Sequence, residues 1–279
     1  MRLQQPAAAL LLLAAATAAS GQTYNRVQAS ARPLGLDVVD LVQTRGSDAA
    51  SADFLANELP DLTDFIKGSF EEKSVFNGRS ARVVDPSNLR LVTDADVRTY
   101  FVSEGAGYHN SLGFNVDAKG AVNGDPRLIF PDASSKQAFY DPERNPRRNK
   151  NNPLLAGDFV DLGKFSAGQT LDFFLIANGA RGGTNVYGAD AGRNPDGVDH
   201  MVAFSYAVED SPYLVLGFED LFGGGDNDFN DLVFVLDVGV DNVAKLGAAP
   251  EPGTLIVFGA VGAAALCRRR RPANAEAGA

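Results

Sequence analysis

Short apolar runs alternate with turns rich in Gly, Asn, Asp and Pro from Val83 onward. Runs of this length between such turns are typical of antiparallel strands. The candidate strands are Leu89 to Val92, Val97 to Val102, Arg127 to Phe130, Phe159 to Leu162, Leu171 to Ala177, His200 to Val208, Tyr213 to Phe218 and Leu232 to Val238. The pattern predicts a mainly β protein, with an antiparallel, jelly-roll-like β-sandwich over residues 91–240.

The preceding segment, residues 21–90, is predicted to be a small, partly helical extension. Its apolar positions between residues 48 and 67 have helical spacing, and Pro60 falls among them. They predict either one helix interrupted at this proline or two short helices. The amphipathic patch from Leu34 to Val42 fits a strand or a short helix equally well, and periodicity does not decide between them.

An acidic, glycine-rich stretch separates the last two predicted strands. It begins with Glu219 and Asp220, continues through the three glycines 223–225, and ends with a run of Asp and Asn residues at 226–231. Glycine adopts backbone conformations that other residues avoid, so the chain can wrap tightly here. Carboxylate and amide oxygens on a loop are the ligands that calcium prefers, and it takes roughly six to eight of them.

The sequence therefore predicts one calcium site at one end of the sandwich, which would hold the turn closed and link the last two strands. The predicted ligands are Glu104, Glu219, Asp220, Asp226, Asp228, Asn230 and Asp231. The loop does not match an EF-hand, because no Gly-x5-Glu follows and its flanks have strand character. A solvated acidic turn that binds no ion remains the alternative.

Net charge limits the partners. The chain has 279 residues and a formal net charge of -10 at pH 7. This excess of acid repels polyanions, so we expect no nucleic acid partner, and an anionic surface is disfavoured. The basic cluster from Arg144 to Asn152 is the exception. It would contact an acidic polysaccharide or a phosphate, or it is simply a solvated loop.

The two ends of the chain have the character of sorting signals. Residues 1–20 contain a short apolar run and small residues suited to cleavage, which predicts a secretory signal peptide. At the C-terminal end, a linker, 241–249, leads to the triplet Pro250, Glu251 and Pro252. An apolar segment, 253–267, follows and is predicted to insert in the membrane. The cluster Arg268, Arg269, Arg270 and Arg271 comes directly after it. The arginines should stay cytoplasmic. The only cysteine, Cys267, lies in this segment, so no disulfide can form within one chain.

This C-terminal pattern resembles the PEP-CTERM sorting signal of Gram-negative bacteria; the tail 272–279 after the arginines is a departure from it. The resemblance implies recognition by an exosortase, a membrane cysteine protease, with cleavage near the Pro-Glu-Pro triplet. It also implies a transient inner-membrane intermediate, followed by delivery to the cell surface or the extracellular matrix. By analogy with other carriers of the signal, the context would be exopolysaccharide or biofilm matrix.

The body resembles the domain of unknown function 4114. The resemblance rests on three stretches, Ser103 to Gly113, Asp199 to Phe204 and Gly217 to Phe234. It implies a β-sandwich module and supplies no mechanism, because the biochemical role of these domains is largely unassigned.

We expect a non-enzymatic, exported surface or matrix module stabilised by calcium. Only His109 and His200 offer imidazoles, and neither lies in a recognised hydrolase motif. His200 opens an apolar strand and is expected to be a hydrogen-bonded structural residue. The first alternative is a calcium-dependent carbohydrate-binding module, although the chain has no tryptophan to stack on a sugar. An extracellular hydrolase, with His109 as its base, is the least supported reading.

Overall fold

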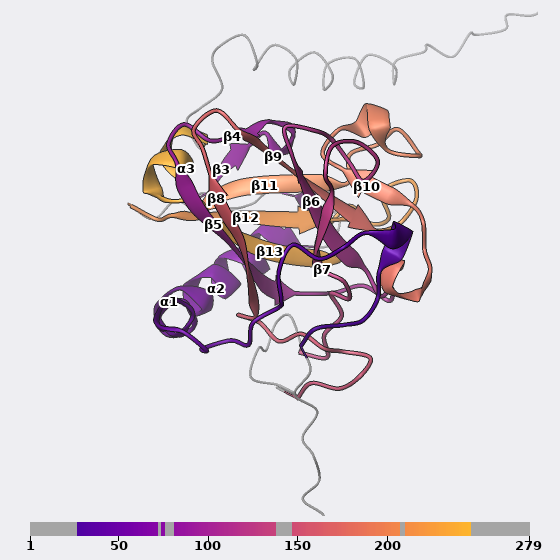
Figure 1. The fold of residues 1–279 in the computed structure, drawn as a ribbon, viewed down its shortest axis with the longest axis horizontal. Helices are drawn as coiled ribbons and strands as arrows, with labels where there is room; N and C mark the ends of the chain where they lie inside the picture. Colours follow the sequence, from indigo (N-terminus) through magenta and orange to yellow (C-terminus); the bar gives the residue numbers. More distant parts are fainter. Residues whose placement is uncertain (1–26, 72–73, 76–80, 138–146, 207–209, 247–279) are drawn as a thin grey trace, which may run out of the picture.

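The structure is a computed structural model and describes residues 27–71, 74–75, 81–137, 147–206 and 210–246 (Figure 1). The predicted signal peptide, sorting signal and membrane segment lie outside these ranges. Within them, none of the helices has both the length and the apolar character needed to cross a bilayer.

Two antiparallel sheets account for eleven strands of the described residues. The six-stranded sheet has the order β3 (Ala81–Val84), β11 (Met201–Tyr206), β12 (Tyr213–Phe218), β13 (Leu232–Asp237), β5 (Ala95–Ser103) and β8 (Phe159–Phe165). The five-stranded sheet has the order β10 (Val186–Gly188), β9 (Thr170–Ile176), β6 (Ser111–Val116) and β7 (Arg127–Phe130), with β4 (Leu89–Arg90) also paired to β9. A separate hairpin joins β1 (Phe70–Glu71) to β2 (Ser74–Val75).

The main core lies between the two sheets. It joins buried residues of the small sheet, such as Leu112 and Phe173, to buried residues of the large one, such as Phe101 and Phe234. The rings of Phe173 and Phe234 are 5.4 Å apart, centre to centre. Side chains alternate between the faces of each strand, so each sheet contributes one apolar face to this core. The predicted mainly β sandwich is confirmed.

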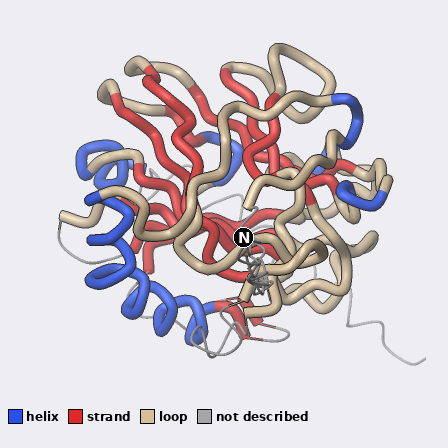
Figure 2. Tube along the Cα trace, turned by 60° about the horizontal axis from the view of Figure 1, so that its bottom comes forward, coloured by secondary structure: helices blue, strands red, loops and turns tan. Residues whose placement is uncertain are grey.

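A helical segment covers the outer face of the six-stranded sheet (Figure 2). It runs through α1 (Ala49–Asp53), a π-helical turn (Phe54–Glu58) and α2 (Leu59–Ser69). Phe54 stacks on Tyr100 of β5 at 3.9 Å between ring centres. Pro60 lies at the start of α2, where no intrahelical N–H is needed. The predicted helical segment is present, but it is not broken at Pro60: the π-helical turn ends at Glu58, and the proline lies in the first turn of α2.

Residues 27–47 lie along both sheets as an irregular strap. Their regular structure consists of one 3-10 turn (Pro33–Gly35) and single bridges from Val38 to Leu128 and from Gln43 to Phe159. The patch 34–42 is therefore neither the strand nor the helix that the sequence left open. The strands β3 and β4 lie before residue 91, the predicted start of the sandwich. Further 3-10 turns span Pro86–Asn88, Gly179–Arg181 and Ala191–Arg193, and α3 (Val240–Leu246) follows β13.

The strand β6 is the main element that the sequence pattern did not predict. Gly113 and Asn115 interrupt its apolar run. Gly113 is required by packing, since a Cβ there would lie 2.4 Å from Cζ of the Phe174 ring on β9. The strand pairs with both β7 and β9 and so lies inside the sheet.

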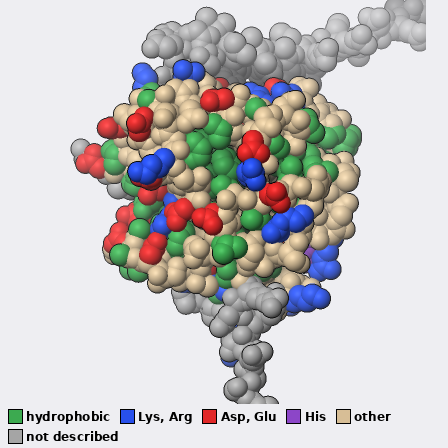
Figure 3. All heavy atoms as spheres, in the orientation of Figure 1, with side chains coloured by type: hydrophobic (Ala, Val, Ile, Leu, Met, Phe, Trp, Pro, Cys, Tyr) green, Lys and Arg blue, Asp and Glu red, His purple; other side chains and the backbone are tan. Residues whose placement is uncertain are grey.

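Charge is mixed on the face shown in Figure 3. There, Lys and Arg side chains lie among Asp and Glu side chains, with hydrophobic and uncharged groups between them. The described residues on this face therefore do not form a continuous basic surface.

Candidate metal centre

The acidic stretch connects β12 to β13 at one end of the sandwich. The last pair of the hairpin is Phe218 with Leu232, so residues 219–231 form the connecting loop. Inside the loop, the backbone N–H of Asp220 donates to the Asp231 carboxylate at 2.9 Å. The helix α3 follows the other end of β13. The acidic loop and α3 therefore lie at opposite ends of β13.

The loop is tightly wound. Positive φ angles occur at Gly223, Gly224, Gly225, Asn227 and Phe229. Two successive turns close with hydrogen bonds of 3.0 Å, from the N–H of Gly224 to the Leu221 carbonyl and from the N–H of Asn227 to the Gly224 carbonyl. At Gly225 the backbone passes so close to Glu219 that a Cβ would lie 2.0 Å from its Oε1. Glycine is therefore required there to admit the carboxylate.

Two groups of carboxylates converge within the loop. Glu219, Asp220 and Asp231 form one group, and Glu219, Asp226 and Asp228 form the other. In each group, one ligand atom per residue lies within 4.8 Å of the others. We call them the inner group and the outer group, because Asp226 of the second is exposed. Glu219 belongs to both. The predicted site thus brings five of its seven residues together, arranged around one shared glutamate.

Glu219 has a buried carboxyl oxygen without a hydrogen-bond partner. The residue is only 1% exposed, and the atom without a partner is Oε2. Asp220 and Asp228 are 3% and 4% exposed. Burial of a carboxylate oxygen without a partner is costly, so such atoms are usually matched by a donor, a proton or a cation.

The crowding raises several pKa values. Burial, followed by the nearby Asp231 carboxylate, raises the pKa of Glu219 to about 8. The same two causes raise the pKa of Asp220 to about 7, and burial also raises the pKa of Asp231. Without a cation, the cluster must therefore retain protons near neutral pH to limit repulsion.

Glu104 and Asn230, the other two predicted ligands, lie at the edge of the cluster. Oε2 of Glu104 accepts the N–H of Ser135 at 3.1 Å. Burial raises the pKa of Glu104 to about 8, and Asp132, Asp231 and Asp220 add to the rise. The side-chain amide nitrogen of Asn230 donates to Asp228, and the backbone carbonyl of Asn230 accepts the N–H of Gly105 at 3.2 Å. Asn230 therefore ties the loop to the end of β5.

Three residues outside the predicted set hold the loop in place. Asn110 donates its amide N–H to Asp220 at 2.6 Å. His200 is fully buried, stacks on Tyr187 at 3.8 Å and bonds through Nδ1 to the Glu219 carbonyl at 2.8 Å. The Nε2 atom of His200 lies 2.8 Å from Oδ2 of Asp196. The same oxygen accepts the N–H of Gly223 at 2.7 Å. His200 is thus a hydrogen-bonded structural residue, as predicted.

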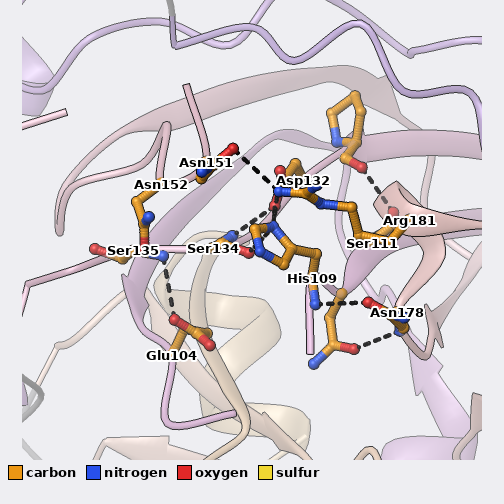
Figure 4. Close-up of polar contacts among 12 residues, drawn as sticks. Glu104, His109, Ser111, Asp132, Ser134, Ser135, Asn151, Asn152, Asn178 and Arg181 are labelled. Carbon is orange, nitrogen blue, oxygen red and sulfur yellow. Dashed lines mark hydrogen bonds and ion pairs between the residues drawn. The ribbon is translucent and has the colours of Figure 1, made fainter. Parts of the chain in front are cut away.

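His109 lies in a neighbouring polar cluster (Figure 4). Its Nδ1 lies 3.3 Å from both Asp132 oxygens and 3.0 Å from Oγ of Ser134. A serine hydrolase triad needs the acid and the serine at opposite nitrogens of the ring. Here both meet the same nitrogen, so these three residues do not form that relay.

The basic cluster 144–152 contributes a buried ion pair. Arg148 bonds through both terminal nitrogens to Asp158, and the two side chains are 8% and 0% exposed. Asp158 also accepts the backbone N–H of Arg45 at 2.9 Å and of Leu155 at 2.7 Å. Arg148 is therefore a structural residue, whereas the sequence predicted that the cluster is either a solvated loop or a site for an anion. Arg144 lies outside the described residues.

Comparison with known protein families gives two matches. The domain of unknown function DUF4114 matches residues 165–239, which include the whole acidic loop, β12 and β13. The PEP-CTERM protein-sorting motif matches residues 248–271. The stretch from Ser103 to Gly113 lies outside both spans, although Asn110 contacts the loop. No curated protein and no solved structure gives a significant match to the chain.

The sorting motif supports an exported protein that is processed by an exosortase and passes through the membrane to the cell surface. The chain thus contains a region that matches the domain of unknown function 4114, followed by a C-terminal segment that matches the PEP-CTERM protein-sorting motif.

Proposed function

We propose that the protein is a non-enzymatic module of the cell surface or extracellular matrix, and that calcium bound by its acidic loop closes one end of the sandwich. The observation that carries the proposal is Glu219, whose buried Oε2 lacks a partner at the centre of two carboxylate groups. A divalent cation shared by these groups would satisfy that oxygen and offset the repulsion between the acids.

The ligand chemistry favours calcium over transition metals. Both groups consist of carboxylates alone, without the imidazole or thiolate ligands that zinc and copper select. Calcium accepts irregular shells of oxygen ligands at 2.3–2.6 Å. Glu219 and Asp220 directly follow β12 and Asp231 directly precedes β13, so an ion in the inner group would link the ends of the two strands.

Calcium should stabilise the chelator-treated full chain. At a hundredfold excess over the dissociation constant, one site contributes about 2.7 kcal/mol. For a folded body of this size, that corresponds to a rise in Tm of roughly 5–10 °C. Thermal unfolding in calcium, in magnesium and in chelator measures it. An unchanged Tm in calcium would sink the proposal, and an equal rise in magnesium would contradict the choice of ion.

The ion-free protein should lose stability as pH rises from about 5 to about 8. Glu104, Glu219 and Asp220 have pKa values in the folded state raised to about 8, about 8 and about 7, from ordinary values near 4. The folded state then binds more protons than the unfolded state in this window, so the free energy of unfolding falls with pH.

Calcium should reverse this trend, because it replaces the protons and binds better once they have left. The check is the unfolding free energy from urea titrations at several pH values, with calcium and with chelator. A calcium effect that shrinks as pH rises, or ion-free stability that climbs over the same range, would contradict the account.

A further inference from the structure

The acidic loop carries an exposed apolar tip. Phe222 is 67% exposed and Leu221 is 45% exposed, and both follow directly after the cluster residues Glu219 and Asp220. Among the described residues, Phe222 is the only phenylalanine that is largely exposed. Val198, 37% exposed, lies beside the same loop, within 3.7 Å of a Cβ built at Gly224. We call Val198, Leu221 and Phe222 the apolar tip.

The tip is held in place by the fold. Phe222 and Gly223 are the two central residues of the turn closed by Leu221 and Gly224, and the φ of 84° at Gly223 suits that position. A residue at the corner of such a turn points away from the body. The N–H of Gly223 is fixed by Asp196, which is itself held by His200. A bulky apolar side chain is thus presented to water on an ordered turn.

The charge of the acidic cluster determines which surfaces the apolar tip can bind. Without a cation, the cluster repels an anionic surface, in keeping with the net charge of the chain. With a cation in the outer group, the three carboxylates of Glu219, Asp226 and Asp228 supply between three and six oxygens, depending on whether each binds through one or both, whereas calcium takes about six to eight. Asp226 is exposed, so oxygens from outside the protein could complete that shell.

We infer that the apolar tip docks on an anionic lipid surface when calcium occupies the outer group. Headgroup phosphate oxygens would complete the shell of the ion, while Phe222 and Leu221 enter the boundary between headgroups and acyl chains. An apolar tip beside a bound cation is complementary to an amphiphile with an anionic head. The inference rests on the proposed calcium site, and it places the contact at the end of β13 opposite to α3.

The absence of tryptophan allows a direct test in the full chain. The variant Phe222→Trp places a single fluorescent reporter at the tip, and Val83→Trp places one at an exposed position of β3, 58% exposed, as the matched control. Each is mixed with vesicles of phosphatidylcholine and phosphatidylglycerol, or of phosphatidylcholine alone, in calcium or in chelator. Calcium binding without vesicles is measured separately by calorimetry.

We expect a blue shift of emission for Phe222→Trp only with anionic vesicles and calcium, and no calcium-dependent shift for Val83→Trp. The segment 253–267 is common to all variants, so the calcium-dependent part of the signal isolates the tip. Phe222→Ser should weaken calcium-dependent vesicle binding by about tenfold or more and leave calcium affinity in solution unchanged.

Three outcomes would overturn the inference. If calcium binds but neither emission nor vesicle binding responds, the docking is wrong and the calcium site stands. Binding to vesicles that is equally strong in calcium and in chelator assigns the tip another role. If calorimetry detects no calcium binding, the proposed function and the docking fail together.

Discussion

Replacement of Glu219 by glutamine is expected to abolish the calcium-induced rise in Tm. Glu219 is the one residue common to both carboxylate groups, so its loss removes a ligand from each. Glutamine keeps the size of the side chain and removes its charge. In chelator, the variant should be at least as stable as the wild type, because a neutral glutamine avoids both the cost of burying a charge and the repulsion with Asp231, the two main causes that raise the pKa of Glu219.

The matched control is Asp64→Asn, which removes one exposed carboxylate on α2, 81% exposed in its side chain. It should keep the full response to calcium. Thermal unfolding of both variants, in calcium and in chelator, separates a loss of ligand from a general loss of charge. A Glu219→Gln protein that gains as much Tm from calcium as the wild type would contradict the assignment.

Asp158→Ala is expected to cost about 3–5 kcal/mol of unfolding free energy, whatever the calcium concentration. The substitution leaves Arg148 charged, only 8% exposed in its side chain and without its carboxylate. It also leaves the N–H groups of Arg45 and Leu155 without an acceptor. Urea unfolding, followed by circular dichroism, measures the loss.

The double variant Arg148→Met and Asp158→Ala provides the control. Removing both charges should recover a substantial part of the loss, because the main penalty is the unpaired buried guanidinium. If Asp158→Ala alone unfolds no more easily than the wild type, the pair is not the structural link described here. If the double variant is as unstable as the single one, the backbone contacts of Asp158 dominate.

Uninterrupted apolar runs made much of the sandwich predictable from the sequence. β7 and β12 were predicted with the bounds that the structure has, since both are continuous runs bordered by polar turns. β6 was missed because Gly113 and Asn115 break its pattern for reasons of packing that involve Phe174. The secondary structure of the strap, residues 27–47, could not be predicted from its sequence, because its backbone forms only single bridges to strands that are distant in the chain.

The candidate site was predictable only in part. Local composition revealed the acids of the loop, and Glu104 was expected near them because it follows shortly after a predicted strand, Val97 to Val102. Nothing local pointed to Asn110 or Asp196, whose partners Asp220 and Gly223 lie 110 and 27 positions away. The division into two groups around Glu219 depends on how the turns at Gly223 to Gly225 aim each carboxylate, which only the fold specifies.

The most direct test is equilibrium dialysis of the chelator-treated full chain against radioactive calcium, beside the Glu219→Gln variant. The account predicts that the wild type retains calcium at neutral pH, that acidification to about pH 5 releases it as the carboxylates take up protons, and that the variant retains almost none. Equal retention by wild type and variant, or no retention by either, would contradict it.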